Sequence, residues 1–190
     1  MLYLSGVVRS DMPAMITPRM GQRSPTGQPW AADNGRFSAP QNYTDAGYLA
    51  WLKTMPAETC LFAVAPDVVG DATATLAMSA PMLPRIRTAG YRAAFVAQDG
   101  QESLPVPWDA IDVLFIGGTT GWKLGPNAEA IAREAKRRGK WVHMGRVNSY
   151  ERGRYARWLG CDSIDGTQFS WFRDTKLPAY LNSLRQEMLA

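Results

Sequence analysis

The feature that most constrains the fold is a repeated order of short apolar runs and helix-like segments. The apolar runs that we interpret as strands are Leu2–Val8, Cys60–Ala65, Ala93–Ala97, Val113–Ile116, Trp141–Met144 and Asp162–Ile164. The segments that we interpret as helices are Asp45–Met55, Ala72–Ala89, Asn127–Arg138, Tyr150–Leu159 and Pro178–Leu189. Apolar strands that alternate with helices are typical of a parallel sheet covered on both faces. The pattern therefore predicts an α/β fold.

Such a sheet either stays open or closes into a barrel. No Gly-x-Gly-x-x-Gly turn follows the first strand, which disfavours an open dinucleotide-binding sheet. Polar residues follow nearly every strand, and chemistry spread over many strand ends is typical of barrels. We therefore predict a small (β/α)8-type, TIM-like barrel, formed as a single domain by residues 1–190. This length is short for the fold, so the sequence leaves open whether the barrel is closed or incomplete, and Phe169–Phe172 is a candidate for a further strand.

Two segments depart from the regular pattern. Residues 9–43 are rich in Pro, Gly, Ser and Asn, with one apolar island at Trp30–Ala32. Long irregular stretches in a compact domain are often functional, so we expect a functional loop here. Pro81 and Pro84 lie inside the helix predicted over Ala72–Ala89. Because proline removes a helical hydrogen bond, we expect this helix to be bent or divided.

Composition narrows the classes of function. Hydrophobic residues make up 46% of the chain, as expected of a globular protein, and no apolar run is long enough for a membrane helix. The first residues lack the pattern of a signal peptide, so we expect a cytoplasmic protein without a membrane partner. The formal net charge of +4 is compatible with a polyanionic partner.

The chain offers few ligands for a metal ion. It contains two cysteines, Cys60 and Cys161, and a single histidine, His143. These three side chains cannot complete a four-coordinate Cys/His zinc site, and no Cys-x-x-Cys pair is present. We therefore predict buried free thiols, no zinc subdomain, no metal and no cofactor.

Polar residues and glycines lie at the ends of the predicted strands and of the apolar island. They are Asp33, Asp67, Gln98, Asp99, Gly117, Gly118, Arg146, Asp162 and Asp165. The carboxyl ends of parallel strands meet at one mouth of a barrel, so we expect these residues to share a site. Two neighbouring carboxylates can divide the chemistry, since one can attack a sugar carbon while the other transfers protons.

The order of these segments resembles that of one known family, the tRNA-guanine transglycosylases and their DNA-acting relatives. The segments that carry the resemblance are Ala32–Phe37, Phe62–Asp67, Phe95–Gly100, Phe115–Gly118, His143–Val147 and Gly160–Asp165. In the same order, they are similar to the family's Asp-Ser-Gly-Gly-Phe, a strand ending in Asp, Val-Gln-Gly-Gly, Ile-Gly-Gly, Met-Gly-Val-Gly and Gly-Val-Asp-Met-Phe-Asp. Together they span about residues 31 to 167.

The resemblance implies a role for each matching residue. Asp165 would be the nucleophile that attacks C1′ of a guanosine nucleotide, and Asp33 would be the general acid and base. The residues implied to bind the base or its nucleotide are Asp67, Gln98, Gly117, Gly118, Arg146 and Asp162. Asp162, three residues before Asp165, is also the competing candidate for the nucleophile.

Several features of the tRNA enzymes are missing. The chain lacks their zinc-binding subdomain, has Gly166-Thr167 where they have Pro-Thr-Arg, and is roughly half their length. These departures favour the DNA-modification branch, often phage-encoded, which implies exchange of guanine in DNA for a free 7-deazaguanine derivative. DNA is then the expected partner, and tRNA is less favoured. Two alternatives stay open: an N-glycoside hydrolase acting on a nucleotide or nucleic acid, and a non-catalytic nucleic-acid-binding relative.

Cations near the predicted mouth are candidates for binding phosphates. They are Lys123, Arg152, Arg154 and Arg157, together with Arg146. Trp122 and Trp171 are candidates for stacking on the target base or its neighbours. The basic run Lys136–Lys140 precedes a strand, so we expect it at the opposite end of the barrel. A solvated helix face is the alternative interpretation of these charges.

Overall fold

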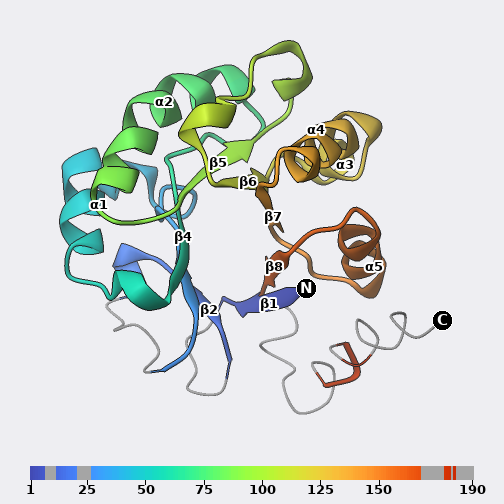
Figure 1. The fold of residues 1–190 in the computed structure, drawn as a ribbon, viewed down its shortest axis with the longest axis horizontal. Helices are drawn as coiled ribbons and strands as arrows, with labels where there is room; N and C mark the ends of the chain where they lie inside the picture. The colour runs from blue at the N-terminus through green and yellow to red at the C-terminus, as the bar shows by residue number, and fades with distance from the viewer. Residues whose placement is uncertain (7–11, 21–26, 168–177, 181, 183–190) are drawn as a thin grey trace.

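The computed structural model describes residues 1–190 apart from 7–11, 21–26, 168–177, 181 and 183–190. Within the described residues, eight parallel strands form a closed barrel in chain order, and β8 pairs with β1 (Figure 1). The strands are β1 (Leu2–Ser5), β2 (Ala14–Ile16), β3 (Trp30–Ala32), β4 (Cys60–Val64), β5 (Ala93–Ala97), β6 (Val113–Ile116), β7 (Trp141–Met144) and β8 (Ser163–Gly166). The predicted TIM-like α/β barrel is confirmed, and it is closed.

The helices lie outside the ring of strands (Figure 1). The α-helices are α1 (Asp45–Leu52), α2 (Ala72–Thr88), α3 (Thr120–Lys123), α4 (Pro126–Arg137) and α5 (Tyr150–Trp158). The 3-10 helices are η1 (Pro18–Met20), η2 (Pro40–Asn42), η3 (Ala57–Thr59), η4 (Gln101–Ser103) and η5 (Trp108–Ala110). Among the helices that the structure describes, none is long and apolar enough to cross a membrane.

Two strands, β2 and β3, lie inside the segment that the sequence predicts as an irregular loop. Each is only three residues long, too short for a recognisable apolar pattern. They complete the barrel without Phe169–Phe172, the candidate further strand, which lies outside the described residues. Most of the helix predicted over Pro178–Leu189 also lies outside them.

The sequence predicts that proline bends or divides the second helix. The structure shows that the helix is not divided. α2 is a single helix of 17 residues that contains both Pro81 and Pro84. Both prolines are exposed, and so are Ala77 and Ala80, the residues whose carbonyl groups lose their helical partner. Water can satisfy those carbonyl groups on the outer face, so the helix continues through both positions.

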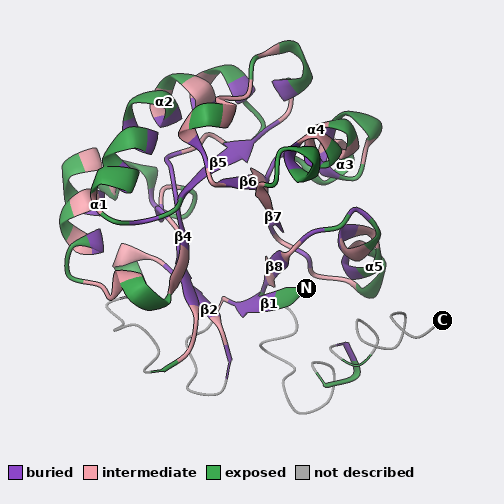
Figure 2. Ribbon diagram, viewed as in Figure 1, coloured by how far each residue is buried: buried purple, intermediate pink, exposed green. Residues whose placement is uncertain are grey.

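The strands are largely buried (Figure 2). Buried side chains form two groups, and the strands contribute to both. One group packs the helices onto the outside of the barrel and includes Leu52, Ile86 and Ala132. The other comes from alternate strand positions and fills the interior. Its buried members are Leu4, Met15, Ala31, Phe62, Val64, Ala94, Val96 and Val113.

The barrel interior, apolar elsewhere, contains polar side chains at its last two strands, β7 and β8. His143 of β7 is buried, and its ring centroid lies 4.4 Å from that of Phe115 and 5.1 Å from that of Phe62. Buried Ser163 and half-buried Asp165 of β8 lie beside it. Polar groups inside a barrel cost free energy unless they are hydrogen-bonded, so this region is a candidate for function.

Candidate active site

A cavity of about 90 Å³ lies at the carboxyl ends of the strands. Residues predicted from the sequence provide a large share of its lining, and they are Asp33, Asp67, Gln98, Gly117, Arg146 and Asp165. They follow, or in the case of Asp165 belong to, six different strands. The parallel barrel therefore brings these residues into one site, as expected.

Asp33 directly follows β3 and lines the same cavity as Asp67 and Asp165. Its Oδ1 accepts a hydrogen bond of 2.9 Å from the backbone N–H of Gly35. Burial raises the pKa of Asp33 to about 6, and the charges of Asp67 and Asp165 add to this, while the Gly35 N–H opposes it. A carboxyl group with this pKa can donate and accept a proton near neutral pH.

Asp67 is held in place by two amide side chains. Its Oδ1 accepts from Asn34 Nδ2 at 3.0 Å, and its Oδ2 accepts from Gln98 Nε2 at 2.8 Å. The Arg36 guanidinium donates to the Asp67 carbonyl oxygen at 2.8 Å. Burial raises the pKa of Asp67, and these neighbours partly offset that effect. Each carboxylate oxygen keeps a lone-pair direction for a ligand, so Asp67 can still accept from a bound base.

Gln98 links Asp67 to the loops beyond β4 and β6. Its Oε1 accepts from the backbone N–H groups of Gly70, at 3.0 Å, and Gly118, at 2.7 Å. The Gly118 N–H is thus occupied, and Gly118 orients Gln98 in this structure where the sequence predicts contact with a base. Gly117 does line the cavity, and a Cβ there would lie only 2.5 Å from Val96 Cγ1. Only glycine fits at this close approach.

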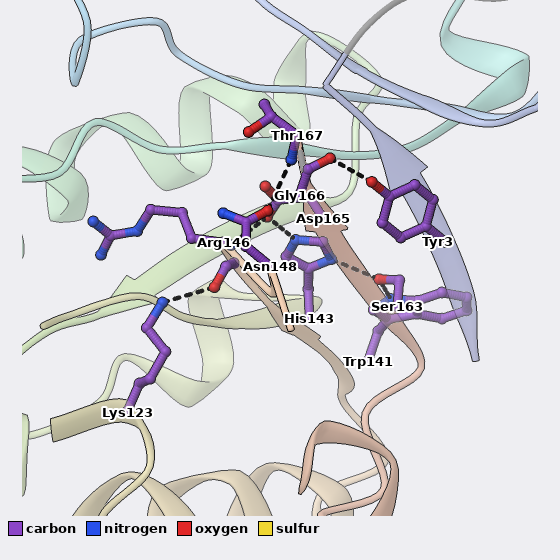
Figure 3. A network of polar contacts seen from close by, with 11 residues as sticks. Tyr3, Lys123, Trp141, His143, Arg146, Asn148, Ser163, Asp165, Gly166 and Thr167 are labelled. Atoms are coloured by element: carbon purple, nitrogen blue, oxygen red, sulfur yellow. Dashed lines mark hydrogen bonds and ion pairs between the residues drawn. The ribbon is translucent and has the colours of Figure 1, made fainter. Parts of the chain in front are cut away.

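Asp165 lies on the barrel wall, and two nitrogen atoms contact its Oδ1. His143 Nε2 is 3.0 Å from Oδ1, and the backbone N–H of Arg146 is 3.3 Å from it. On its other side, His143 contacts Ser163 Oγ through Nδ1, at 2.8 Å. Figure 3 shows these groups, which the β7 and β8 strands bring together. The nucleophile predicted from the sequence therefore has an ordered set of hydrogen bonds.

Arg146 has a φ of 56°, in the left-handed region that residues other than glycine seldom adopt. Its guanidinium donates to the Gly118 carbonyl oxygen and lies 5.6 Å from the centroid of the Phe37 ring. Phe37 lines the cavity and is 66% exposed. These two side chains form an apolar and cationic rim over the carboxylates.

The prediction that Lys123 binds phosphate is wrong, because this side chain is only 1% exposed. Its Nζ donates to the Gly145 carbonyl oxygen at 2.7 Å, next to the strained Arg146 (Figure 3). Burial lowers the pKa of Lys123 to about 8, and the nearby charge of Arg146 lowers it further. Lys123 therefore holds the loop after β7 in place through the Gly145 carbonyl group.

The prediction that Asp162 binds substrate is also wrong. Asp162 precedes β8, at the opposite end of the barrel from Asp165. It forms an ion pair with Lys136 at 2.8 Å and accepts from the Val142 backbone N–H at 2.8 Å. Lys136 begins the basic run that was expected at this end, and the Asp162 contact agrees with that placement.

The three arginines of α5 do not form one surface at the mouth. Arg152 lies in the first turns, where its guanidinium contacts the Arg146 carbonyl oxygen at 3.4 Å. Arg154 is exposed in the middle of the helix, and Arg157 lies in its last turn. Helices of a parallel barrel run back from the mouth, so Arg157 lies well away from the cavity.

The two candidate stacking tryptophans receive no support. Trp122 is half-buried, does not line the cavity, and donates from Nε1 to Glu102 at 2.9 Å. Trp171 lies outside the described residues.

Sequence reasoning missed several residues that shape the site, namely Met15, Asn34, Arg36, Phe37 and His143. One signal for His143 was available: it occupies an inward position of an otherwise apolar strand, one strand away from the proposed nucleophile. Such a histidine needs a partner, and Asp165 is the nearest candidate along the barrel.

The part of the chain that the structure describes was expected to hold no metal ion. No group of three or more His, Cys, Asp or Glu side chains there is arranged to hold a metal ion. Cys60 is half-buried and Cys161 is buried, and both are free thiols. Burial raises the pKa of each thiol to about 12, which makes both unreactive near neutral pH.

Comparison with known proteins places the chain in no family. No family model matches it, and no curated protein matches it. Among solved structures, it is similar to the phosphodiesterase PaMucR in complex with c-di-GMP, with 16% identity and a TM-score of 0.45, over 73% of this chain and 59% of that one. It is also similar to the Bacillus subtilis YkuI protein, which has an EAL domain and is complexed with c-di-GMP and calcium. That match has 15% identity and a TM-score of 0.45, over 95% of this chain and 46% of that one.

A third similar structure is the tryptophan synthase alpha subunit of Legionella pneumophila, with 11% identity and a TM-score of 0.45, over 92% of this chain and 90% of that one. The chain spans less than two thirds of the length of the first two structures. None of the three is described as a guanine transglycosylase.

Proposed function

We propose that this protein is a base-exchanging transglycosylase that replaces guanine in DNA with a 7-deazaguanine derivative. The observation that carries the proposal is the convergence of Asp33 and Asp165 on one cavity, whose lining also includes the hydrogen-bonded pair Asp67 and Gln98. Exchange at a sugar carbon needs a nucleophile, a group that transfers protons, and a pocket that recognises the base.

The chemistry proceeds in two balanced steps. In the first, an oxygen of Asp165 forms a bond to C1′ while the bond between C1′ and the base breaks, and Asp33 gives its proton to the departing guanine. In the second, Asp33 takes a proton from the incoming base, whose nitrogen attacks C1′ and displaces the Asp165 carboxylate. The raised pKa of Asp33, about 6, suits both directions of proton transfer.

Recognition of the base rests on Asp67 and the rim. Asp67 is oriented by Asn34 and Gln98, so its free lone pairs can accept from the N1–H and 2-amino group of a guanine. Exposed Phe37 offers an aromatic face on which the base can stack. A base inside duplex DNA must leave the helix to reach this cavity.

The non-catalytic alternative is disfavoured by one observation. If the chain only bound nucleic acid, nothing would require Asp33 and Asp165 to share a cavity, yet both line it. Hydrolysis uses the same nucleophile as exchange, with water in place of the incoming base, and it remains an outcome of the test.

The test is mass spectrometry of nucleosides from DNA incubated with the protein and a 7-deazaguanine base. The proposal predicts deazaguanine nucleoside in the DNA and an equivalent amount of free guanine. In a parallel reaction, isotope-labelled guanine should enter the DNA. Guanine release without incorporation of either base would mean hydrolysis, and intact DNA under all conditions would refute the proposal.

A further inference from the structure

We infer that a hydrogen-bonded chain through the barrel wall selects which oxygen of Asp165 attacks. The chain runs from Trp141 through Ser163 and His143 to Asp165 Oδ1 (Figure 3). It makes His143 a positioning residue that holds Oδ1 and leaves Oδ2 to form the bond to C1′. This inference rests on the proposed function for its chemistry, while its geometry can be tested without any reaction.

Strand register explains how four side chains meet inside the barrel. Trp141 and His143 are two residues apart on β7, and Ser163 and Asp165 are two residues apart on β8. His143 is paired directly with Ser163 across the two strands. Residues two apart on a strand point to the same side. All four side chains therefore lie on one face of the two strands, next to one another in Figure 3, and Trp141 packs against the cluster that fills the barrel interior.

The direction of each hydrogen bond follows from the chemistry of the groups. The indole Nε1–H of Trp141 can only donate, and it lies 2.8 Å from Ser163 Oγ. The Ser163 hydroxyl hydrogen is then directed to His143 Nδ1, at 2.8 Å, the acceptor that it reaches among the described residues. With Nδ1 accepting, the neutral ring carries its hydrogen on Nε2, and Nε2–H donates to Asp165 Oδ1. The Ser163 hydroxyl at Nδ1 and the Asp165 carboxylate at Nε2 thus both favour the Nε2–H tautomer of His143.

The ring cannot easily adopt another orientation. His143 has no exposed surface, and the rings of Phe62 and Phe115 pack against it. On the mouth side, Arg146 N–H provides a second donor to Oδ1, and Lys123 fixes the adjoining Gly145 carbonyl group. Two donors therefore meet at Oδ1, and among the described residues we find no hydrogen bond to Oδ2 that would compete with substrate.

This arrangement has a use in both steps of the exchange. When Oδ2 bonds to C1′, Oδ1 becomes the carbonyl oxygen of the resulting ester and keeps its two donors. When the incoming base displaces Asp165, negative charge returns to the carboxylate, and His143 Nε2–H and Arg146 N–H stabilise it. Donors placed where charge develops lower the barrier without reorganising. The chain thus makes Asp165 a good leaving group.

The tautomer can be measured directly because His143 is the only histidine in the sequence. Long-range proton–nitrogen correlation spectra of the full protein, recorded at the pH of the exchange assay, should show a neutral ring with its hydrogen on Nε2. An Nδ1–H ring or an imidazolium in the unmodified protein at that pH would overturn the inference.

Kinetics test the effect on Asp165. Phenylalanine at position 143 keeps a planar ring but has no donor, whereas glutamine can place an amide N–H near Oδ1. His143→Phe should lower kcat by about 10–100-fold, the range expected for one hydrogen bond to a charged group, with KM unchanged. His143→Gln should recover much of that loss. Equal losses in both variants would show that His143 matters only for packing.

Two further measurements keep the outcomes distinct. If His143→Phe does not fold, His143→Asn serves in its place, because its shorter amide can reach Ser163 but not Asp165. If the unmodified protein exchanges no base, the proposed function fails, while the tautomer spectra still report whether the chain is arranged as inferred.

Discussion

Asp33 and Asp165 share a cavity but differ in their hydrogen-bond donors. Asp165 Oδ1 accepts from a histidine ring and a backbone N–H, whereas Asp33 accepts from the Gly35 N–H. Burial raises the pKa of Asp33 to about 6. Groups in one site whose environments differ in this way can take different roles, and here Asp33 is suited to proton transfer and Asp165 to nucleophilic attack.

The pKa of Asp33 predicts opposite pH dependences for the two steps. Formation of the glycosyl-enzyme needs protonated Asp33, so its single-turnover rate should fall as the pH rises through about 6. Attack by the incoming base needs ionised Asp33, so its rate should rise through the same pH. Rapid-quench measurements of each step would test this. The same pH dependence for both steps would contradict the assignment of Asp33 as both acid and base.

The raised pKa also has a consequence for stability. A carboxyl group whose pKa is higher in the folded state destabilises the fold once it ionises, above about pH 6, and has no such effect below the ordinary value of 3.8. Asp33→Asn keeps the acceptor for Gly35 but carries no charge. We expect it to raise the free energy of unfolding by about 1–3 kcal/mol at pH 8 and to have little effect near pH 4. Urea unfolding at both pH values measures this, with Asp109→Asn as an exposed control.

Asp162 and Asp165 provide a matched pair for testing the nucleophile. Asp165→Asn should abolish exchange and leave the fold intact, because the asparagine amide oxygen can still accept from His143 and from the Arg146 N–H. Asp162→Asn should keep exchange but lose about 1 kcal/mol of stability, since it weakens the contact with Lys136 at the far end. Active Asp165→Asn together with inactive Asp162→Asn would show that the carboxylates are assigned wrongly.

At the scale of elements, the helices and strands that depend on local interactions were predicted correctly from the sequence. α1, α2 and α5 begin where predicted because Thr44, Asp71 and Ser149 each cap a helix by accepting the N–H three residues further on. Strands β4 to β7 were found because buried parallel strands are apolar throughout. Most predicted site residues then followed, since residues after such strands must converge on the mouth.

What the sequence could not show depends on tertiary contacts. β2 and β3 are three residues each and are defined by their neighbours in the barrel. Lys123 looks like a surface cation, and only the packing of α3 against the loop after β7 reveals its burial. Asp162 and Asp165 are close in sequence, yet a strand rises about 3.3 Å per residue, so they lie about 10 Å apart along it.

The orientation of α5 predicts a gradient in DNA binding along this helix. Arg152 lies near the mouth and Arg157 lies in the last turn. Arg152→Ala should weaken duplex binding and reduce the log–log salt slope by about one, as for the loss of one phosphate contact, whereas Arg157→Ala should change both less. Titrations at several salt concentrations measure this.

Lys136→Ala is the control for that series, because it removes a cation from the far end of the barrel. A larger loss of affinity in Lys136→Ala or Arg157→Ala than in Arg152→Ala would mean that DNA approaches the other face, and the mouth would not be the binding surface.

At the scale of the whole molecule, closure of the barrel gives the site its form. The eight described strands run in parallel, so their carboxyl ends surround a single mouth. Strands β1 to β6 fill the interior with apolar side chains, and the polar chain from Trp141 to Asp165 occupies the wall of β7 and β8. One side of the barrel thus provides packing and the other holds the proposed nucleophile.

The central claim is that exchange passes through a covalent bond between Asp165 and the sugar of DNA. The most direct test is to denature the protein rapidly during turnover on DNA, digest the trapped adduct, and locate the modified residue by peptide mass spectrometry. We expect a deoxyribose-linked adduct on Asp165 that disappears when excess 7-deazaguanine is added before quenching. An adduct on another residue, or base exchange with no adduct under conditions that trap it, would contradict this mechanism.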